Sequence, residues 1–290
     1  MRIVHLSDIH VGRLPRSPRA LFDKRVLGAA NFLLRRSRQF HPEYFQRACD
    51  DIGRLKPELV VCTGDLTCIG SPEELEAAAA LMRPLCVDGG QRFLFLPGNH
   101  DAYVGAADCR AALARTFRSL NGGRWELDAL PLEWQVSGLR FLLLDGARPV
   151  SCLLSSGALT AATLDWLAHR LALPREDGEC RVVICHFPLR GATGKALGRR
   201  RRLEGAEVVW QHLQEGRLDL VLSGHVHAPF ARWDATGRGE VCAGSLTLGG
   251  CFSVLDWTPG TRRFRQFFVD VTASREPQLP AIDVSLAPVS

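Results

Sequence analysis

Five short apolar runs of the chain each end in a cluster of Asp, Asn or His side chains. The clusters are Ser7-Asp8-Ile9-His10, Thr63-Gly64-Asp65, Pro97-Gly98-Asn99-His100-Asp101, Cys185-His186-Phe187-Pro188 and Ser223-Gly224-His225-Val226-His227. An apolar run of about four to eight residues that ends in Gly, Ser or Asp is typical of a buried strand. Open α/β sheets bind ligands at the carboxyl ends of their strands, so the pattern predicts one site that all five clusters share.

The order of the expected elements favours an α/β fold. We expect strands over 3–7, 59–63, 93–97, 133–136, 139–144, 182–186, 218–223, 240–243, 252–257 and 264–271, and helices over 21–37, 44–56, 72–85, 106–120, 160–173 and 204–214. Early strands that alternate with helices, followed by closely spaced strands, indicate layers in which sheet packs on sheet. We therefore expect a single domain over 1–271, with 272–290 as an extended or mobile C-terminal tail.

The side chains of the five clusters have the chemistry of a two-metal site. The candidate ligands are Asp8, His10, Asp65, Asn99, His186, His225 and His227. So many mixed nitrogen and oxygen donors exceed the roughly four ligands of one zinc site, and they suit two divalent ions about 3.5–4 Å apart that share a carboxylate. Any one of these histidines alone would more often be a structural core residue. Next to Asn99, His100 with Asp101 suits a general acid with an orienting carboxylate.

The order of the motifs, D-x-H, G-D, G-N-H-D, H-F-P and G-H-x-H, resembles the calcineurin-like metallophosphoesterase family over roughly residues 1–257. The resemblance implies a four-layer αββα sandwich of two mixed sheets flanked by helices. It also implies a metal-dependent hydrolase of phosphoric esters or pyrophosphates. In such an enzyme a hydroxide that bridges the two ions would attack phosphorus, and His100 would protonate the leaving oxygen or stabilise the developing charge.

The resemblance also assigns the ligands. One ion would be held by Asp8, His10, Asp65 and His227. The other would be held by Asp65, Asn99, His186 and His225. We expect two divalent ions, with Mn²⁺ first and Fe or Zn²⁺ as alternatives, because mixed His, Asp and Asn donors favour these over Mg²⁺ or Ca²⁺.

The formal net charge of +5 comes from two local segments. Segment 13–47 holds nine Lys or Arg against two acidic residues, and segment 190–202 holds six with no acidic residue. Both directly follow a ligand cluster, so we expect them at the rim of the site, with an anionic substrate as the partner. The candidate substrate contacts are Arg35, Arg36, Arg199 and Arg200. Residues 21–37 have the pattern of a basic amphipathic helix, which suits a membrane surface or a lipid ligand, although an ordinary solvated helix has the same pattern.

The basic segments favour a pyrophosphate-linked lipid as the substrate, because arginines pair with phosphates while apolar side chains shelter acyl chains. Segment 13–47 resembles the insertion of the UDP-2,3-diacylglucosamine hydrolases of lipid A synthesis. The main hypothesis is therefore hydrolysis of UDP-2,3-diacylglucosamine to UMP and a lipid 1-phosphate.

The alternative hypothesis is a 3′,5′-cyclic nucleotide phosphodiesterase. Class III enzymes of that kind share G-N-H-D, H-F-P and a segment similar to Gly157-x-Leu159 with Leu164-x-Trp166-Leu167. A remote alternative is a scaffold of the same fold without catalysis. No apolar run is long enough for a transmembrane helix or a signal peptide, so we expect a cytoplasmic protein. Under the main hypothesis it contacts the inner membrane peripherally through 13–47. We expect no dedicated nucleic-acid module.

Overall fold

The computed structural model describes residues 1–16, 23–26, 28, 40–151, 153–272 and 281–287 of the chain. Most of the helix expected over 21–37 lies outside these residues, and so do Arg35 and Arg36. Within the described residues, no helix combines the length and the apolar character that crossing a bilayer requires.

Two six-stranded sheets form the centre of the molecule. The first has the order β14 (Ile282–Ser285), β13 (Arg263–Asp270), β12 (Cys251–Thr258), β1 (Arg2–Leu6), β2 (Leu59–Cys62) and β3 (Phe93–Phe95). The second has the order β10 (Phe230–Trp233), β11 (Gly239–Cys242), β9 (Leu220–Ser223), β7 (Cys180–Ile184), β5 (Leu139–Leu143) and β4 (Leu132–Val136). Each sheet is mixed: β1, β2 and β3 run parallel, as do β5, β7, β9 and β11, while the remaining strands pair antiparallel.

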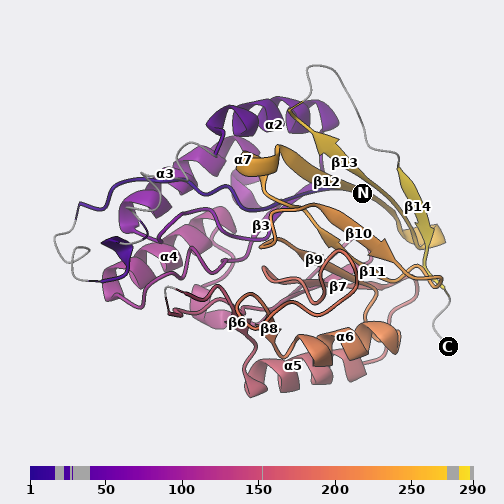
Figure 1. Ribbon diagram of the computed structural model, residues 1–290. Coiled ribbons are helices and arrows are strands. Elements are labelled where there is room, and N and C mark those ends of the chain that lie inside the picture. Colours follow the sequence, from indigo (N-terminus) through magenta and orange to yellow (C-terminus); the bar gives the residue numbers. More distant parts are fainter. Residues whose placement is uncertain (17–22, 27, 29–39, 152, 273–280, 288–290) are drawn as a thin grey trace.

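Helices cover the outer faces of both sheets. Those on the first sheet are α2 (Pro42–Leu55), α3 (Pro72–Met82), α4 (Ala107–Leu120) and the short α7 (Leu246–Gly249). Those on the second sheet are α5 (Ala161–Ala172) and α6 (Ala206–Gln214). In Figure 1, α2 lies above the sheets and α5 and α6 lie below them, which confirms the predicted αββα sandwich. The smaller elements are β6 (Gly157–Ala158), β8 (Leu203–Glu204) and the 3₁₀ turns η3 (Arg83–Leu85), η4 (Val87–Gly90), η5 (Leu127–Ala129) and η6 (Pro259–Thr261).

The buried strands are apolar on both faces because each sheet lies between two layers. On β2, Val61 points into the core between the sheets, while Val60 packs under the helices of the first sheet. On β7, Val182 points between the sheets and Val183 packs against α5 and α6. This double burial explains why these strands are continuous apolar runs rather than alternating ones.

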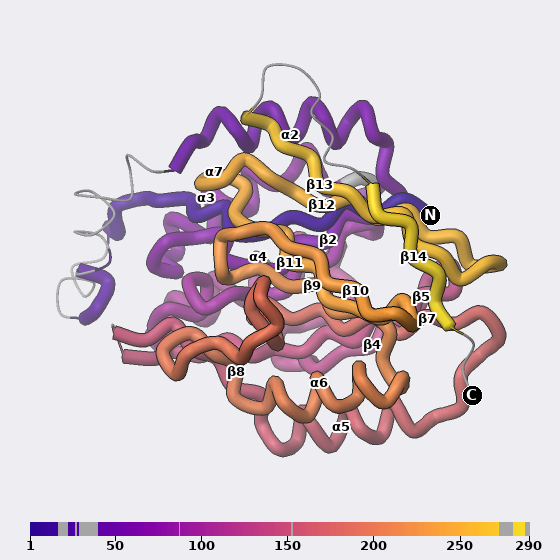
Figure 2. The backbone as a smooth tube through the Cα atoms, turned by 45° about the vertical axis from the view of Figure 1, so that its right-hand side comes forward, coloured from indigo at the N-terminus to yellow at the C-terminus, as the bar shows by residue number. Residues whose placement is uncertain are grey.

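The carboxyl ends of the central strands meet at one edge of the sandwich (Figure 2). The turn after β1 is bonded to the turn after β2, because the backbone N–H of Asp8 donates to the carbonyl of Gly64 at 2.9 Å. The turn after β9 is bonded to the turn after β7, because the N–H of Gly224 donates to the carbonyl of His186 at 2.8 Å. The fold thus brings the sequence clusters together at the predicted place.

Part of the expected tail belongs to the first sheet. Strand β14 pairs antiparallel with β13, with Val284 opposite Phe264, and Val284 is buried. The strand is short and follows prolines, so its alternation of Ile282, Val284 and Leu286 is a weak strand signal in the sequence. Edge strands of this length are common in natural sheets.

Helix α3 begins beside the strand ends and carries a buried carboxylate. Ser71 is its N-cap and accepts a hydrogen bond from the N–H of Glu74, and Pro72 lies in its first turn. The Glu74 carboxylate accepts the backbone N–H of Ile69 at 2.8 Å and that of Arg13 at 3.2 Å. Burial raises the pKa of Glu74 to about 7, although the backbone hydrogen bonds oppose the shift. Glu74 therefore ties the chain that follows His10 to the chain that follows Asp65.

We expect Glu74→Gln to flatten the pH dependence of stability. The folded-state pKa of about 7 lies above the ordinary value of 4.5, so the folded state binds the proton more tightly, and the stability from this group falls as pH rises through that window. Calorimetric Tm values from pH 5 to 8 measure the slope, with the exposed Glu76→Gln on the same helix as the matched control. Equal slopes for Glu74→Gln and the wild type would contradict the assignment.

Candidate metal centre

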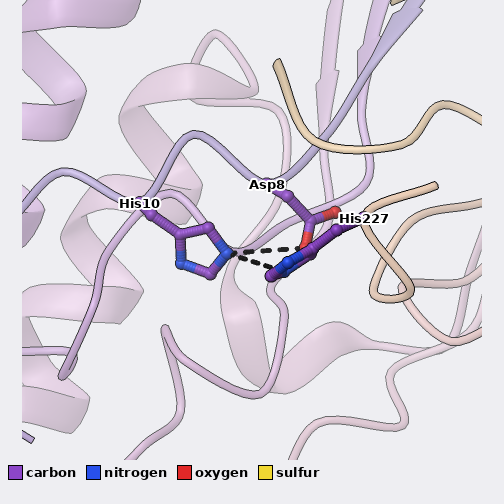
Figure 3. Close-up of side chains that lie close together, drawn as sticks. All are labelled: Asp8, His10 and His227. Atoms are coloured by element: carbon purple, nitrogen blue, oxygen red, sulfur yellow. Dashed lines mark hydrogen bonds and ion pairs between the residues drawn. The ribbon is translucent and has the colours of Figure 1, made fainter. Parts of the chain in front are cut away.

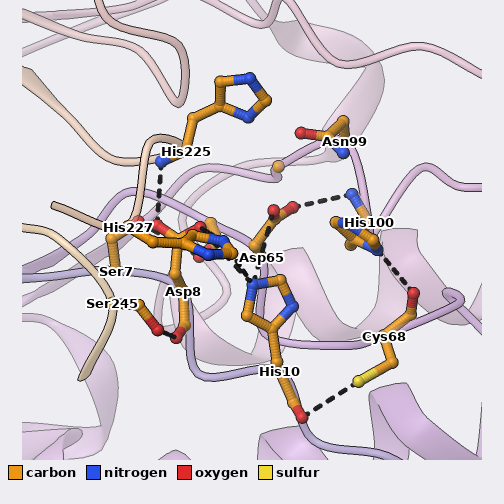
Figure 4. Close-up of polar contacts among 12 residues, drawn as sticks. Ser7, Asp8, His10, Asp65, Cys68, Asn99, His100, His225, His227 and Ser245 are labelled. Atoms are coloured by element: carbon orange, nitrogen blue, oxygen red, sulfur yellow. Dashed lines mark hydrogen bonds and ion pairs between the residues drawn. The ribbon is translucent and has the colours of Figure 1, made fainter. Parts of the chain in front are cut away.

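The structure brings all seven predicted ligands together. Figure 4 shows six of them, Asp8, His10, Asp65, Asn99, His225 and His227, around one site. Ligand atoms of Asp8, His10 and His227 lie within 4.8 Å of one another (Figure 3). A second group with the same spacing consists of Asp65, His186 and His225. His10, Asp65 and His100 form a third group with the same spacing. The first two groups contain members of the two ligand sets that the resemblance implies.

Asp65 and Asn99 complete the arrangement. Asp65 Oδ2 lies 3.3 Å from His186 Nε2 in the second group and 4.0 Å from His10 Nε2 in the first. Asn99 Oδ1 lies 3.2 Å from His186 Nε2. The position of Asp65 between the groups is that of a shared ligand.

Left-handed backbone turns aim most of these side chains. Positive φ angles occur at Asp8 (57°), His10 (53°), Asp65 (53°), His225 (70°) and His227 (62°). Non-glycine residues occupy this region rarely and at an energetic cost, and such residues concentrate at functional sites. The common direction of Asp8 and His10 therefore comes from a strained turn.

Two glycines of the motifs are required by close packing. A Cβ on Gly98 would overlap the Asp65 side chain, and a Cβ on Gly224 would overlap Ser7 and Asp8. Any larger residue would push the turns of G-N-H-D and G-H-x-H away from the two carboxylates. The glycines in these motifs thus set how closely the ligands approach.

Backbone carbonyls fix the histidine rings. His10 Nδ1 lies 3.2 Å from the carbonyl of Thr67, and His186 Nδ1 lies 2.6 Å from the carbonyl of Thr63. A carbonyl only accepts, so Nδ1 carries the proton in both rings and Nε2 is left as the ligand atom. His225 is held the other way, because its Nε2 lies 3.1 Å from the carbonyl of Arg201, which leaves Nδ1 as the ligand atom.

The electrostatics fit bound cations. Asp8 Oδ1 is buried without a hydrogen-bond partner among the described residues, and it lies 3.2 Å from His227 Nε2. Burial would raise the pKa of Asp8, but His10 and His227 outweigh it and hold that pKa well below its usual range. Burial would also raise the pKa of Asp65, but the neighbouring His186 and His100 outweigh it, and the pKa of Asp65 is lowered. Asp8 and Asp65 are thus both ionised and buried, and their described ion pairs are with histidines alone. Bound divalent cations would compensate the negative charge of these two carboxylates.

Protons compete with metal ions at His186. Burial would lower the pKa of His186, but the Asp65 carboxylate raises it to about 9. Burial lowers the pKa of His225 to about 3, with His186 adding to the shift. Ligation needs the neutral imidazole, so metal uptake is expected to release a proton from His186 and to weaken in acid.

The structure corrects the role expected for Asp101. The carbonyl of Cys68 accepts from His100 Nδ1 at 2.6 Å and so orients this ring. The Asp101 carboxylate points elsewhere, accepting the N–H groups of Gly98 and Thr67 and the Thr67 hydroxyl, each at 3.0 Å. Neighbouring residues in a tight turn point in different directions, so Asp101 acts on the Thr67–Cys68 segment instead of on His100 directly.

None of the predicted substrate arginines has a described contact with a candidate ligand in the part of the chain that the structure describes. Arg35 and Arg36 lie outside the described residues, and Arg199 and Arg200 are exposed. The residue that touches the site is Arg201, whose carbonyl faces His225 Nε2 and whose Nη2 donates to the His225 carbonyl at 3.3 Å. The Arg199–Arg202 run marked this residue in the sequence, but did not distinguish it from its neighbours.

Other basic residues of the two segments turn toward the protein. Lys24 donates to the carbonyl of Val150 at 2.6 Å. Arg25 is buried, pairs with Asp23 and donates to Cys109 Sγ. Arg190 pairs with Glu207 at 2.6 Å. These three cations therefore do not form the anionic-substrate rim that the charge distribution predicted.

Two aromatic side chains at the site were missed. Phe40 stacks on His10 with ring centroids 4.9 Å apart, and Tyr103 stacks on His100 with centroids 5.8 Å apart and an interplanar angle of 7°. Tyr103 follows His100 by three residues, which was a usable signal. Nothing in the sequence around Phe40 links it to His10.

The calcineurin-like phosphoesterase family model matches residues 1–229. The chain therefore belongs to the calcineurin-like phosphoesterase family. The family binds dinuclear metals, and the two donor groups around Asp65 are the candidate ligands in this chain.

The names of the curated relatives specify a class of substrate, which the family name does not. A cAMP/cGMP dual specificity phosphodiesterase of Mycobacterium tuberculosis is 28% identical over 173 residues, which cover 60% of this chain and 49% of that protein. A probable cyclic nucleotide phosphodiesterase of Rhodococcus erythropolis is 30% identical over 135 residues, which cover 46% of this chain and 39% of that protein. The matches thus span half or less of the relatives' length.

Solved structures support the fold. A dimetal phosphatase from Danio rerio superposes with a TM-score of 0.68 at 16% identity, and the alignment covers 99% of both chains. At this identity the likeness shows the fold alone.

We expect Asp65→Ala to lose both metal ions, because its carboxylate lies between the two donor groups. His227→Ala should lose only the ion of the first group and keep the one near His186. Metal analysis after loading with Mn²⁺ and removal of free ion measures both, with the exposed Asp128→Ala as the control that keeps full occupancy. Retention of one ion by Asp65→Ala would contradict the shared-ligand assignment.

Proposed function

We propose that this chain hydrolyses the phosphodiester of 3′,5′-cyclic nucleotides with two divalent ions held around Asp65. The observation that carries the proposal is the paired donor geometry on a chain whose relatives bear cyclic nucleotide phosphodiesterase names. The donor geometry supports phosphoester hydrolysis, and the relatives point to the class of substrate.

In the proposed reaction, the residues of the site hold the two metal ions and orient the ligand histidines. When bound, two divalent ions lower the pKa of a water molecule and neutralise charge on the phosphoryl oxygens. Asp65 holds the two positions together, and the carbonyls of Thr67 and Thr63 keep His10 and His186 turned toward them. Such fixed rings need no reorganisation during the reaction.

His100 is the proposed proton donor to the leaving oxygen. It is half-buried, whereas the ligands His10 and His186 are buried, so it lies on the side of the site that substrate approaches. Its backbone N–H donates to Asp65 Oδ1 at 2.7 Å, and its Nδ1 is held by Cys68. Nε2 is then the ring nitrogen that delivers the proton.

The segment shared with class III phosphodiesterases supports the ligand turn. A Cβ on Gly157 would overlap the ring of Phe187, which directly follows His186 and is fully buried. Leu159 belongs to the same core as Phe187. This segment therefore packs the H-F-P turn in place and is consistent with the cyclic nucleotide hypothesis.

The described basic residues favour a compact substrate. The lipid hypothesis needs a basic apolar cover over the site, but Lys24 and Arg25 are engaged with groups of the protein, and Arg190 pairs with the exposed Glu207. The apolar part of that cover, 29–37, lies outside the described residues. A cyclic nucleotide carries one negative charge and requires fewer cations.

We expect AMP release from 3′,5′-cyclic AMP in the presence of Mn²⁺, and none from the Asp65→Ala variant. UDP-2,3-diacylglucosamine in detergent, at equal concentration, tests the lipid substrate in parallel. UMP release without AMP release would overturn the proposal in favour of the lipid hydrolase. Turnover of neither substrate, by protein that binds no metal, would favour the scaffold.

Arg201 is the proposed phosphate contact of loop 190–202. The carbonyls of Arg200 and Arg202 accept the backbone N–H groups of Ser155 and Gly157. The carbonyl of Arg201 lies 3.1 Å from His225 Nε2 instead, and the Arg201 Nη2 donates to the His225 carbonyl at 3.3 Å. These two contacts place the Arg201 guanidinium beside a candidate ligand and select it from the four consecutive arginines.

We expect Arg201→Ala to raise KM for cyclic AMP by about tenfold or more, since a charge-assisted hydrogen bond contributes about 1.5–3 kcal/mol. The contact to His225 Nε2 comes from the backbone carbonyl, so metal content should not change. Arg199→Ala is the matched control and should leave KM unchanged. Equal KM increases in the two variants would indicate a diffuse charge effect and contradict the specific contact.

A further inference from the structure

We propose that Tyr103 and Lys24 position His100, so that residues 23–26 and 28 act as a clamp on the turn that carries the proton donor. The inference rests on the proposed function only in taking His100 as that donor. It assigns a positioning task to Lys24, which belongs to the basic segment expected at the rim of the site.

The three side chains form a continuous stack. The rings of His100 and Tyr103 are nearly parallel, with centroids 5.8 Å apart, and Lys24 Nζ lies 4.1 Å from the centroid of the Tyr103 ring. Lys24 Nζ also donates to the carbonyl of Val150. A cation over an aromatic face is an attractive contact, and the second bond fixes where the ammonium sits.

The backbone at Gly28 packs on the same turn. A Cβ there would overlap Ile69 Cγ2 and would lie 3.2 Å from the Tyr103 hydroxyl oxygen. Ile69 directly follows Cys68, whose carbonyl holds His100 Nδ1. Lys24 and Gly28 therefore contact Tyr103, and Gly28 also packs on the residue that follows Cys68, so this stretch lies against two of the groups that surround the His100 ring. The His10 ring, with its centroid 5.0 Å away, is a third.

Arg25 anchors this stretch of chain. Its side chain is buried, pairs with Asp23 at 2.8 Å and donates to Cys109 Sγ at 3.2 Å near the start of α4. A guanidinium used in this way is a structural tie, not a surface charge. The clamp is thus fixed at α4 through Arg25 and at the chain after β5 through Lys24.

The chemical consequence concerns the leaving group. As a hydroxide formed from water bonds to phosphorus, the bond from phosphorus to the leaving oxygen breaks and its electron pair stays on that oxygen, which takes the proton from His100. The proton that the water lost goes to solvent, and solvent returns one to His100 after the step. The hydrogen bonds at the backbone N–H and at Nδ1 leave the tilt of the imidazole adjustable, and the Tyr103 ring restrains that tilt. Proton delivery matters most for a poor leaving group, so loss of the stack should be selective.

The test compares two substrates that differ in the leaving group: bis(p-nitrophenyl) phosphate, with a good one, and diphenyl phosphate, with a poorer one. We expect Tyr103→Ala to lower kcat on diphenyl phosphate by about tenfold or more and to change kcat on the p-nitrophenyl ester by less than about twofold. Tyr103→Phe should restore both rates because the ring remains. Lys24→Met should fall between Tyr103→Ala and the wild type.

The controls separate positioning from stability. Tyr44→Ala removes the other tyrosine, which packs on His41, and should leave the ratio of the two rates unchanged. Metal content should be equal in all variants, and Tyr103→Leu replaces Tyr103→Ala if the latter does not fold. Equal losses on both esters, or unchanged rates, would overturn the proposal. We expect His100→Ala to show the same selective loss on diphenyl phosphate, and a His100→Ala variant without this selectivity would also overturn the positioning proposal. The proposed function is tested separately, by AMP release from cyclic AMP.

Discussion

The burial of two ionised carboxylates, Asp8 and Asp65, is the constraint on which the rest of the structure depends. Burying an anion is costly unless an opposite charge or several hydrogen bonds compensate it. Among the described residues, the partners of these two carboxylates are histidine rings and backbone N–H groups, and none of their described ion pairs is with Lys or Arg. The left-handed turns and the close glycines persist because they hold these anions where cations can bind them.

One short segment orients both metal ligation and proton transfer. The successive carbonyls of Thr67 and Cys68 hold Nδ1 of His10 and of His100. Asp101 bonds the N–H and hydroxyl of Thr67, and Glu74 bonds the N–H of Ile69. Two buried carboxylates that touch no substrate thus determine how two functional histidines point, and the clamp at Lys24 and Gly28 presses on the same turn.

The sequence predicted the features that depend on local patterns of apolar and polar residues. Each ligand cluster stands where an apolar run stops, so the strands, the sandwich and the convergence of the seven ligands followed from the pattern and the resemblance. It did not predict features that depend on side-chain direction: the inward turn of Arg25, the selection of Arg201 and the Tyr103 stack. Charge counts do not reveal whether a cation faces substrate or a buried carboxylate, and β14 is too short to show its pairing partner.

The central claim is that Asp65 is shared by two ions. Anomalous diffraction from crystals loaded with Mn²⁺ tests it most directly. The account predicts two peaks on either side of the Asp65 carboxylate, one beside Asp8 and His227 and the other beside His186 and His225. A single peak, or a second peak away from Asp65, would contradict it.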